Sequence, residues 1–166
     1  RAQGVGCDCI PEICVDGQTV SSTRIRALLA RGDMAQAVRL LGHPHILTGT
    51  VVSGRRLGRT IGIPTANLAL PEGLLVPRFG VYAAKACFDG RALPAVVNIG
   101  TRPTVDGSGV TVEPWILDYD GDLYGKPLRL EFYEFLRPEQ KFPSLNALRE
   151  AILHNAGQTR AFFAEK

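Results

Sequence analysis

Short apolar runs rich in β-branched residues recur between residues 46 and 135, and turns containing Gly or Pro separate them. The runs suited to β-strands cover residues 46–53, 81–88, 92–99, 111–119 and 128–135. Asp89 and Gly90 join two of these runs, and an Asp-Gly pair is typical of a two-residue type I′ hairpin. Many short strands joined by such turns predict a mostly β fold, either an antiparallel barrel or a sandwich.

Helical patterns flank this β-rich region. Residues 24–31 and 34–41 carry apolar side chains three or four positions apart, which predicts two short helices. Ser and Thr at positions 21–23 and Asp33 are good N-caps, and Gly32 and Gly42 follow the two segments as expected for helix ends. We therefore expect a short helical part before the strands.

A third helix is expected near the C-terminus, where Ser144 is a suitable N-cap. Gly157 weakens the helical pattern, and Phe162 and Phe163 continue its apolar face. The apolar stripe that should pack on the strands consists of Leu145, Leu148, Ile152 and Leu153.

The composition limits the possible classes of protein. The 166 residues suit one domain, or one domain with a fragment, and a formal net charge of +3 does not require a nucleic acid partner. The four cysteines lack the spacing of a metal cluster, so we expect reduced thiols. Residues 1–20 contain no apolar targeting segment and no run spans a bilayer, which favours a soluble, cytoplasmic protein.

The segment from Gly54 to Asn67 carries the clearest chemical signal. Gly54, Gly58 and Gly62 recur every four residues, and a glycine backbone suits close approach to phosphates. Thr65 and Asn67 supply a hydroxyl and a carbonyl oxygen of the kind that Mg²⁺ accepts beside a nucleotide. The segment lacks the spacing of a Walker A loop. It predicts a nucleotide site with another design, although a flexible basic loop remains the alternative.

Glu113 is the candidate general base. It lies among apolar residues on the expected strand 111–119, and alternation places it on one face with Trp115 and Leu117, which predicts that it points inward. A carboxylate in such a position is a candidate for proton transfer, whereas a solvent-facing Glu on an edge strand is the alternative. Pro114 lacks a backbone donor, so it indicates an edge strand or a bulge.

Four sequence blocks resemble those of the riboflavin kinase family, including the kinase module of bacterial bifunctional FAD synthetases. The segment from Gly54 to Asn67 resembles the flap and P-T-A-N signature, and residues 98–104 match N-I-G-x-x-P-T. Residues 117–125 resemble L-D-F-x-x-D-L-Y-G, with Tyr119 in place of the Phe, and residues 135–142 are close to L-R-P-E-x-K-F. These blocks, with Glu113 between them, occur in the family's order over residues 46–160.

The resemblance implies a six-stranded antiparallel Greek-key β-barrel with a long C-terminal helix. It implies that ATP with Mg²⁺ binds under the glycine flap and that riboflavin binds near the later strands. The residue roles that it implies are Glu113 as base, Thr65 and Asn67 as metal ligands, Gly54, Gly58, Gly62, Thr65 and Asn67 at the nucleotide phosphates, and Arg137 at the flavin. Tyr124 and Trp115 are further candidates for the flavin site, although Trp115 departs from the family's usual residues and Tyr124 could equally be a core aromatic. Core packing is the alternative for Trp115.

The N-terminal part has its own resemblance. Residues 20–26 resemble the S-S-T-x-I-R segment that closes the nucleotidyltransferase domain of bacterial FAD synthetases, but that domain's H-x-G-H element is absent. We expect residues 1–43 to be the C-terminal remnant of an α/β FMN adenylyltransferase domain, and residues 44–166 to be the kinase domain. FMN adenylyltransferase activity is then expected of the full-length protein and not of this chain alone.

The expected reaction converts ATP and riboflavin to ADP and FMN, with no nucleic acid or membrane as partner. The main alternative is a small β-barrel module that binds nucleic acid through Arg55, Arg56 and Arg59. Such a module requires an aromatic stacking face, and the aromatic residue nearest in sequence is Phe79. An inactive flavin carrier is a second alternative. The oligomeric state stays open.

Overall fold

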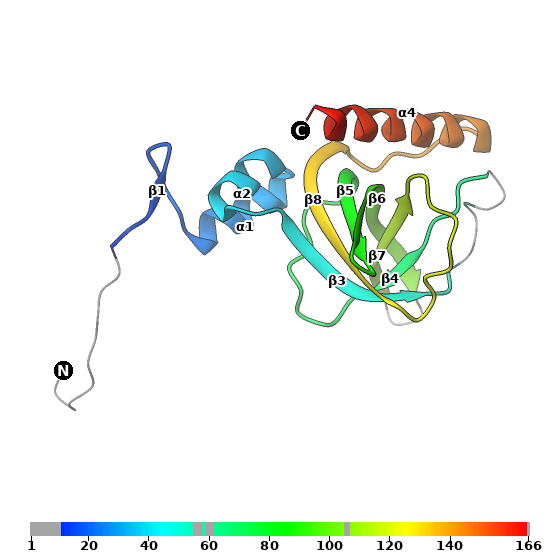
Figure 1. The fold of residues 1–166 in the computed structure, drawn as a ribbon, viewed down its shortest axis with the longest axis horizontal. Helices are drawn as coiled ribbons and strands as arrows, with labels where there is room; N and C mark the ends of the chain where they lie inside the picture. Colours follow the sequence, from blue (N-terminus) through cyan, green and yellow to red (C-terminus); the bar gives the residue numbers. More distant parts are fainter. Residues whose placement is uncertain (1–10, 55–57, 59–61, 105–106, 166) are drawn as a thin grey trace.

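A nearly closed antiparallel barrel forms the centre of the protein (Figure 1). The computed structural model describes residues 11–54, 58, 62–104 and 107–165. The barrel is one six-stranded sheet in the order β4-β3-β8-β5-β6-β7. Its strands are β3 (His45–Val52), β4 (Asn67–Ala69), β5 (Gly80–Phe88), β6 (Arg91–Thr104), β7 (Gly107–Ile116) and β8 (Pro127–Arg137). The predicted barrel class is confirmed.

The five strands predicted from the sequence are all present, with altered ends. Asp89 and Gly90 both have positive φ, of 46° and 73°, as a type I′ hairpin between β5 and β6 requires. Strand β7 ends at Ile116 instead of residue 119, because Asp118 turns the chain with a φ of 57°. The three-residue strand β4 was not predicted, since it is too short for an alternating pattern to stand out.

The two edge strands β4 and β7 meet at a seam. The backbone N–H of Ala66, just before β4, donates a hydrogen bond of 2.9 Å to the carbonyl of Pro114 in β7. Pro114 pairs with Val97 of β6 without a bulge, and its carbonyl points toward β4. Since N–H and C=O of one strand residue point to the same side, the missing donor costs the β6–β7 ladder nothing. The prediction of an edge position is confirmed.

Helices α1 (Ser22–Arg31) and α2 (Met34–Leu41) pack against one side of the barrel (Figure 1). Ser21 and Asp33 are the predicted N-caps, and Gly32 and Gly42 end the helices with a left-handed backbone. Their buried side chains belong to the same core cluster as the barrel interior. This cluster includes Leu28, Leu29, Met34, Tyr82, Val97 and Phe132. The boundary between residues 43 and 44 stays a prediction.

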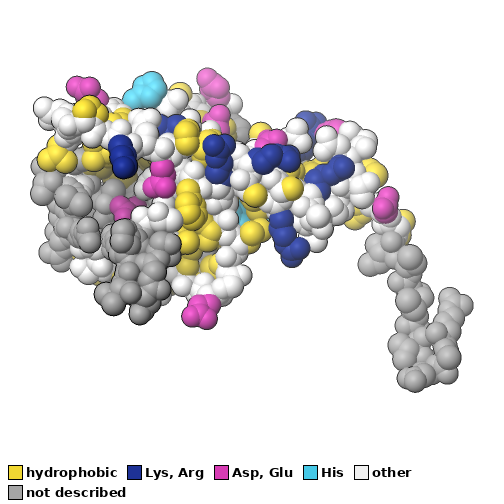
Figure 2. All heavy atoms as spheres, turned by 180° about the vertical axis from the view of Figure 1, so that it is seen from behind, with side chains coloured by type: hydrophobic (Ala, Val, Ile, Leu, Met, Phe, Trp, Pro, Cys, Tyr) yellow, Lys and Arg dark blue, Asp and Glu magenta, His cyan; other side chains and the backbone are white. Residues whose placement is uncertain are grey.

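The residues before α1 form a small hairpin of β1 (Cys14–Val15) and β2 (Gln18–Thr19). Figure 2 shows Lys and Arg side chains over the helical part, where Arg24, Arg26, Arg31 and Arg39 are exposed. Among the described residues, no helix is long and apolar enough to cross a bilayer.

Helix α4 (Leu145–Ala164) lies across the outer surface of the barrel, with Ser144 as its N-cap (Figure 1). The predicted apolar stripe is wrong in part, since Leu145 and Leu153 are 57% and 40% exposed. The buried positions are Asn155, Ala156 and Thr159, in the second half of the helix. There α4 contacts the strands through these short side chains, while its first half covers a cavity.

Gly157 lies inside α4, and a Cβ built on it meets nothing within 4 Å. We expect Gly157→Ala to stabilise the protein by about 0.5–1 kcal/mol, because glycine loses more backbone entropy than alanine in a helix. The midpoint of thermal unfolding should rise by about 1–4 °C. An unchanged or lower midpoint would contradict this view of α4.

Candidate active site

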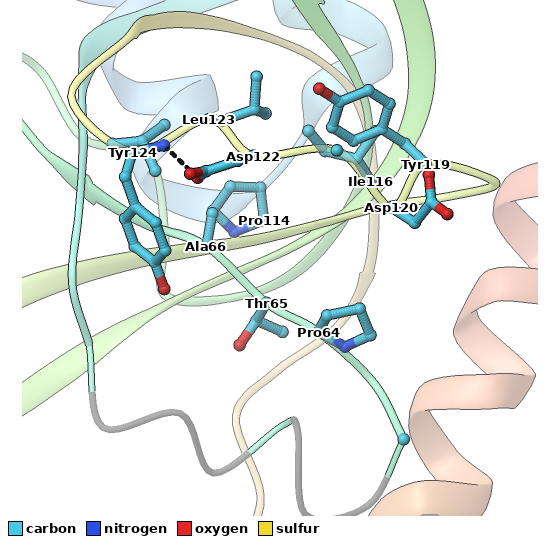
Figure 3. A pocket seen from close by; sticks show the side chains of 13 residues that line it. Pro64, Thr65, Ala66, Pro114, Ile116, Tyr119, Asp120, Asp122, Leu123 and Tyr124 are labelled. Atoms are coloured by element: carbon cyan, nitrogen blue, oxygen red, sulfur yellow. Dashed lines mark hydrogen bonds between the residues drawn. The ribbon is translucent and has the colours of Figure 1, made fainter.

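A first cavity of about 740 Å³ opens at the barrel seam (Figure 3). Its wall combines the segment before β4, the end of β7 and the connector that follows β7. Figure 3 shows Tyr119 and Tyr124 on opposite sides of the cavity in this view, with Thr65 and Pro64 along a third side. Asp122 holds the connector in a turn, since its carboxylate accepts a 2.9 Å hydrogen bond from the Tyr124 N–H.

A second cavity of about 410 Å³ lies between the outer surface of the barrel and the first half of α4. Its apolar wall comes mainly from the strands and the helix, and its polar groups come from the strands β6, β7 and β8, the segment before β4, the loop after β8 and α4. The apolar residues are Val81, Val96, Trp115, Phe142, Leu145, Leu148 and Ile152. The polar residues are Thr65, Asn98, Glu113, Arg137, Glu139, Gln140 and Asn155. A mainly apolar slot with a few converging polar groups is typical of an organic ligand site.

Thr65 lines both cavities. It precedes Ala66, whose N–H is bonded to Pro114, and Pro114 follows Glu113. The seam therefore brings the segment that carries Thr65 next to the strand that carries Glu113. Two ligands, one in each cavity, would meet at Thr65.

Glu113 lies on the side of β7 that faces the second cavity, together with Trp115. The alternation predicted from the sequence is confirmed, but this side is not the barrel interior. The neighbouring residues Val112 and Ile116 belong to the interior cluster and are 1% and 6% exposed. The prediction that Glu113 points inward needs this correction, because both faces of β7 are covered, one by the interior and one by α4. Asn98 of β6 is the residue directly opposite Glu113.

Gly54 and Gly58 leave room for the side chains of the predicted phosphate and metal segment. A Cβ on Gly54 would lie 2.0 Å from Nδ2 of Asn67, and a Cβ on Gly58 would lie 2.1 Å from the Ile63 carbonyl and 3.1 Å from Thr65 Oγ1. Gly62 has a φ of 73° and lines the first cavity. Gly54 and Gly58 are thus needed because the backbone there packs closely against Ile63, Thr65 and Asn67.

The predicted flavin residues do not all lie together. Arg137 and Trp115 line the second cavity beside Glu113. Tyr124 lines the first cavity with Thr65. The short connector after β7 carries Tyr124 to the other side of the seam, and motif order in the sequence does not reveal this separation.

Thr65 and Asn67, the predicted ligands of a metal ion, are held in place by neighbouring residues. Thr65 lines both cavities, and the Asn67 amide packs against Gly54, although Asn67 lines neither cavity. Hydroxyl and amide oxygens fit Mg²⁺, which keeps several waters and shares phosphate oxygens. Within the described residues, no three His, Cys, Asp or Glu side chains group as a metal site. Arg55, Arg56 and Arg59 lie outside the described residues.

Four polar residues of the second cavity were not predicted as site residues, namely Asn98, Glu139, Gln140 and Asn155. Asn155 of α4 is 2% exposed, and the Glu139 carboxylate occupies the place where a Cβ on Gly100 would lie. A signal existed for Glu139, because it belongs to the L-R-P-E block. Asn155 had only the weaker signal of a polar residue on a helix expected to pack.

A family model described as Flavokinase: Riboflavin kinase matches residues 41–163. Curated relatives include the bifunctional riboflavin kinase/FMN adenylyltransferases of Pseudomonas fluorescens, 43% identical over 163 residues, and of Escherichia coli K12, 44% identical over 151 residues. These matches cover 98% and 90% of this chain, and 52% and 48% of the relatives. The chain thus spans about half the length of the curated relatives it matches.

Solved structures give the same fold. A riboflavin kinase from Trypanosoma brucei aligns with a TM-score of 0.51 and 25% identity, over 74% of this chain and 81% of that one. A protein from Streptococcus pneumoniae described as a macrolide-efflux protein aligns with a TM-score of 0.85 and 33% identity, over 91% of this chain and 50% of that one.

We expect Gly54→Ala to weaken binding of ADP with Mg²⁺ about tenfold. The new methyl group would displace the Asn67 amide, which lies 2.0 Å from its position. Isothermal titration with and without Mg²⁺ measures the effect, and Gly157→Ala is the matched control because its methyl group enters open space. Equal affinities of the two variants for ADP with Mg²⁺ would contradict a role of Asn67 in binding the nucleotide and the metal.

Proposed function

The chain belongs to the riboflavin kinase family, and we propose that it transfers the γ-phosphoryl group of ATP to the 5′-hydroxyl of riboflavin, giving FMN and ADP. The observation that carries the proposal is the position of Thr65 on the walls of both cavities. ATP would occupy the first cavity with its phosphates toward Thr65. Riboflavin would occupy the second cavity with its ribityl chain toward Glu113.

The chemical roles follow from this placement. Glu113 accepts the proton of the 5′-hydroxyl as the oxygen bonds to the γ-phosphorus, and the bond from that phosphorus to the bridging oxygen of ADP breaks. Thr65 and Asn67 would hold Mg²⁺ and the phosphates. When bound, the metal neutralises charge on the transferred group. Gly54 and Gly58 leave the space that the side chains of Asn67 and Thr65 occupy.

The flavin ring fits the apolar part of the second cavity. Trp115, Val81 and Val96 supply the wall on the barrel side, and Leu148 and Ile152 supply the wall on α4. Such a slot favours a flat aromatic ring with a polar tail toward the strand ends. The exposure of Leu145 follows from the same arrangement, since it lines an open slot instead of packing in the core.

The nucleic-acid alternative has less support. Its three arginines lie outside the described residues. Among the described residues, exposed arginines occur on α1 and α2 (Figure 2) and also on β6, β8 and α4, and none of these exposed arginines lines either cavity. The relatives are bifunctional enzymes, and this chain spans about half their length. We propose that adenylyl transfer belongs to the longer protein.

Replacing Glu113 tests its proposed role. We expect Glu113→Gln to lower kcat for FMN formation by about 10²- to 10⁴-fold, because the amide keeps the shape of the carboxylate and cannot accept the proton. The affinity for riboflavin should change by less than about threefold, since the amide still hydrogen-bonds. Chromatographic quantification of FMN gives kcat. Near-normal turnover would exclude Glu113 as the base.

Trp115 is the only tryptophan of the chain, and it lines the second cavity. We expect riboflavin to quench its fluorescence in a saturable way, because the flavin ring would lie against the indole. ADP and an RNA oligonucleotide serve as controls that should leave the emission nearly unchanged. Quenching by RNA but not by riboflavin would favour the nucleic-acid alternative.

A further inference from the structure

Asn155 is a buried polar residue on the face of α4 that meets the barrel. It is 2% exposed and lies beside Ala156, which packs in the apolar cluster with Val81 and Val96. Its side-chain Nδ2 donates a hydrogen bond of 3.0 Å to Gln158 Oε1. This bond sets the direction of the amide, so that the carbonyl oxygen Oδ1 points toward the end of β8.

The partner of Oδ1 is Arg137, the last residue of β8. Arg137 Nε donates to Asn155 Oδ1 at 3.0 Å, and Nη1 donates to the Pro138 carbonyl at 3.1 Å. The guanidinium carbon lies 5.4 Å from the centre of the Phe142 ring. Burial lowers the pKa of Arg137, which indicates that the group is partly removed from water.

The guanidinium is thus held on three sides by the protein. Nη2 is left without a hydrogen-bond partner among the described residues. Arg137, Phe142 and Asn155 all line the second cavity, and none of them lines the first. An oriented donor in a partly dry slot suits a neutral polar group of a ligand, because such a bond loses little side-chain entropy when it forms.

We propose that Asn155 is a positioning residue that holds the Arg137 guanidinium in the orientation needed to bind the flavin substrate. This inference rests on the proposed kinase function. Asn155 acts through Arg137 and fixes it from α4, while Glu139 packs on Gly100 and fixes the same loop on β6. We expect the effect to be confined to riboflavin, since Asn155 and Arg137 line only the second cavity and the nucleotide is proposed to bind in the first.

The test compares Asn155→Leu with Asn155→Asp. Leucine has a similar size and removes the acceptor, so we expect KM for riboflavin to rise about 10- to 100-fold while KM for ATP stays within about twofold. Aspartate keeps an acceptor for Arg137 Nε, and the Gln158 side chain can turn its amide so that it donates to the new carboxylate. We therefore expect KM for riboflavin in Asn155→Asp to stay within about threefold of the wild-type value. His154→Ala, on the exposed side of α4, is the matched control.

Two further readouts separate this inference from a loss of fold and from the proposed function. Thermal unfolding shows whether α4 remains packed in each variant, and Trp115 quenching gives riboflavin affinity without turnover. Wild-type protein that neither forms FMN nor binds riboflavin would overturn the proposed function and this inference together. If the wild type is active, three results would overturn the inference alone. They are a folded Asn155→Leu variant with a normal KM for riboflavin, an equal rise in the KM values for riboflavin and ATP, and a KM for riboflavin in Asn155→Asp that is as high as in Asn155→Leu.

Discussion

One backbone hydrogen bond, from the N–H of Ala66 to the carbonyl of Pro114, organises the rest of the structure. It joins the two edge strands of the six-stranded sheet and so nearly closes the barrel. Thr65 precedes one partner and Glu113 precedes the other, so the same bond brings both halves of the candidate site together. Because Pro114 has no N–H, its side of the seam offers only an acceptor, and the donor must come from the segment before β4.

The two faces of β7 explain why the site can be polar beside a closed core. Val112 and Ile116 fill the barrel interior, whereas Glu113 and Trp115 face α4. The second half of α4 packs through Ala156 and other short side chains, which anchors the helix and leaves its first half over an open slot. The first half of α4 thus mainly covers the ligand slot and the second half mainly packs on the barrel, with Asn155 at the boundary between the two.

Local chemistry was predictable from the sequence, and long-range placement was not. Asp89-Gly90 determines its own hairpin through positive φ, so that turn could be read directly. Alternation put Glu113 and Trp115 on one face, but it could not reveal that a helix covers that face. Tyr124 falls in the first cavity because of how the connector after β7 folds back. Leu145 looked like a core residue because an apolar pattern does not distinguish a packed surface from a ligand slot.

The most direct test of the account is a crystal structure of the protein with ADP, Mg²⁺ and riboflavin. The account predicts ADP in the cavity lined by Tyr119 and Tyr124, and the flavin ring beside Trp115 under α4. The ribityl 5′-oxygen should lie within about 2.6–3.2 Å of the Glu113 carboxylate, with the metal at Thr65 and Asn67. A nucleotide in the slot under α4, or a 5′-oxygen beyond reach of Glu113, would contradict it.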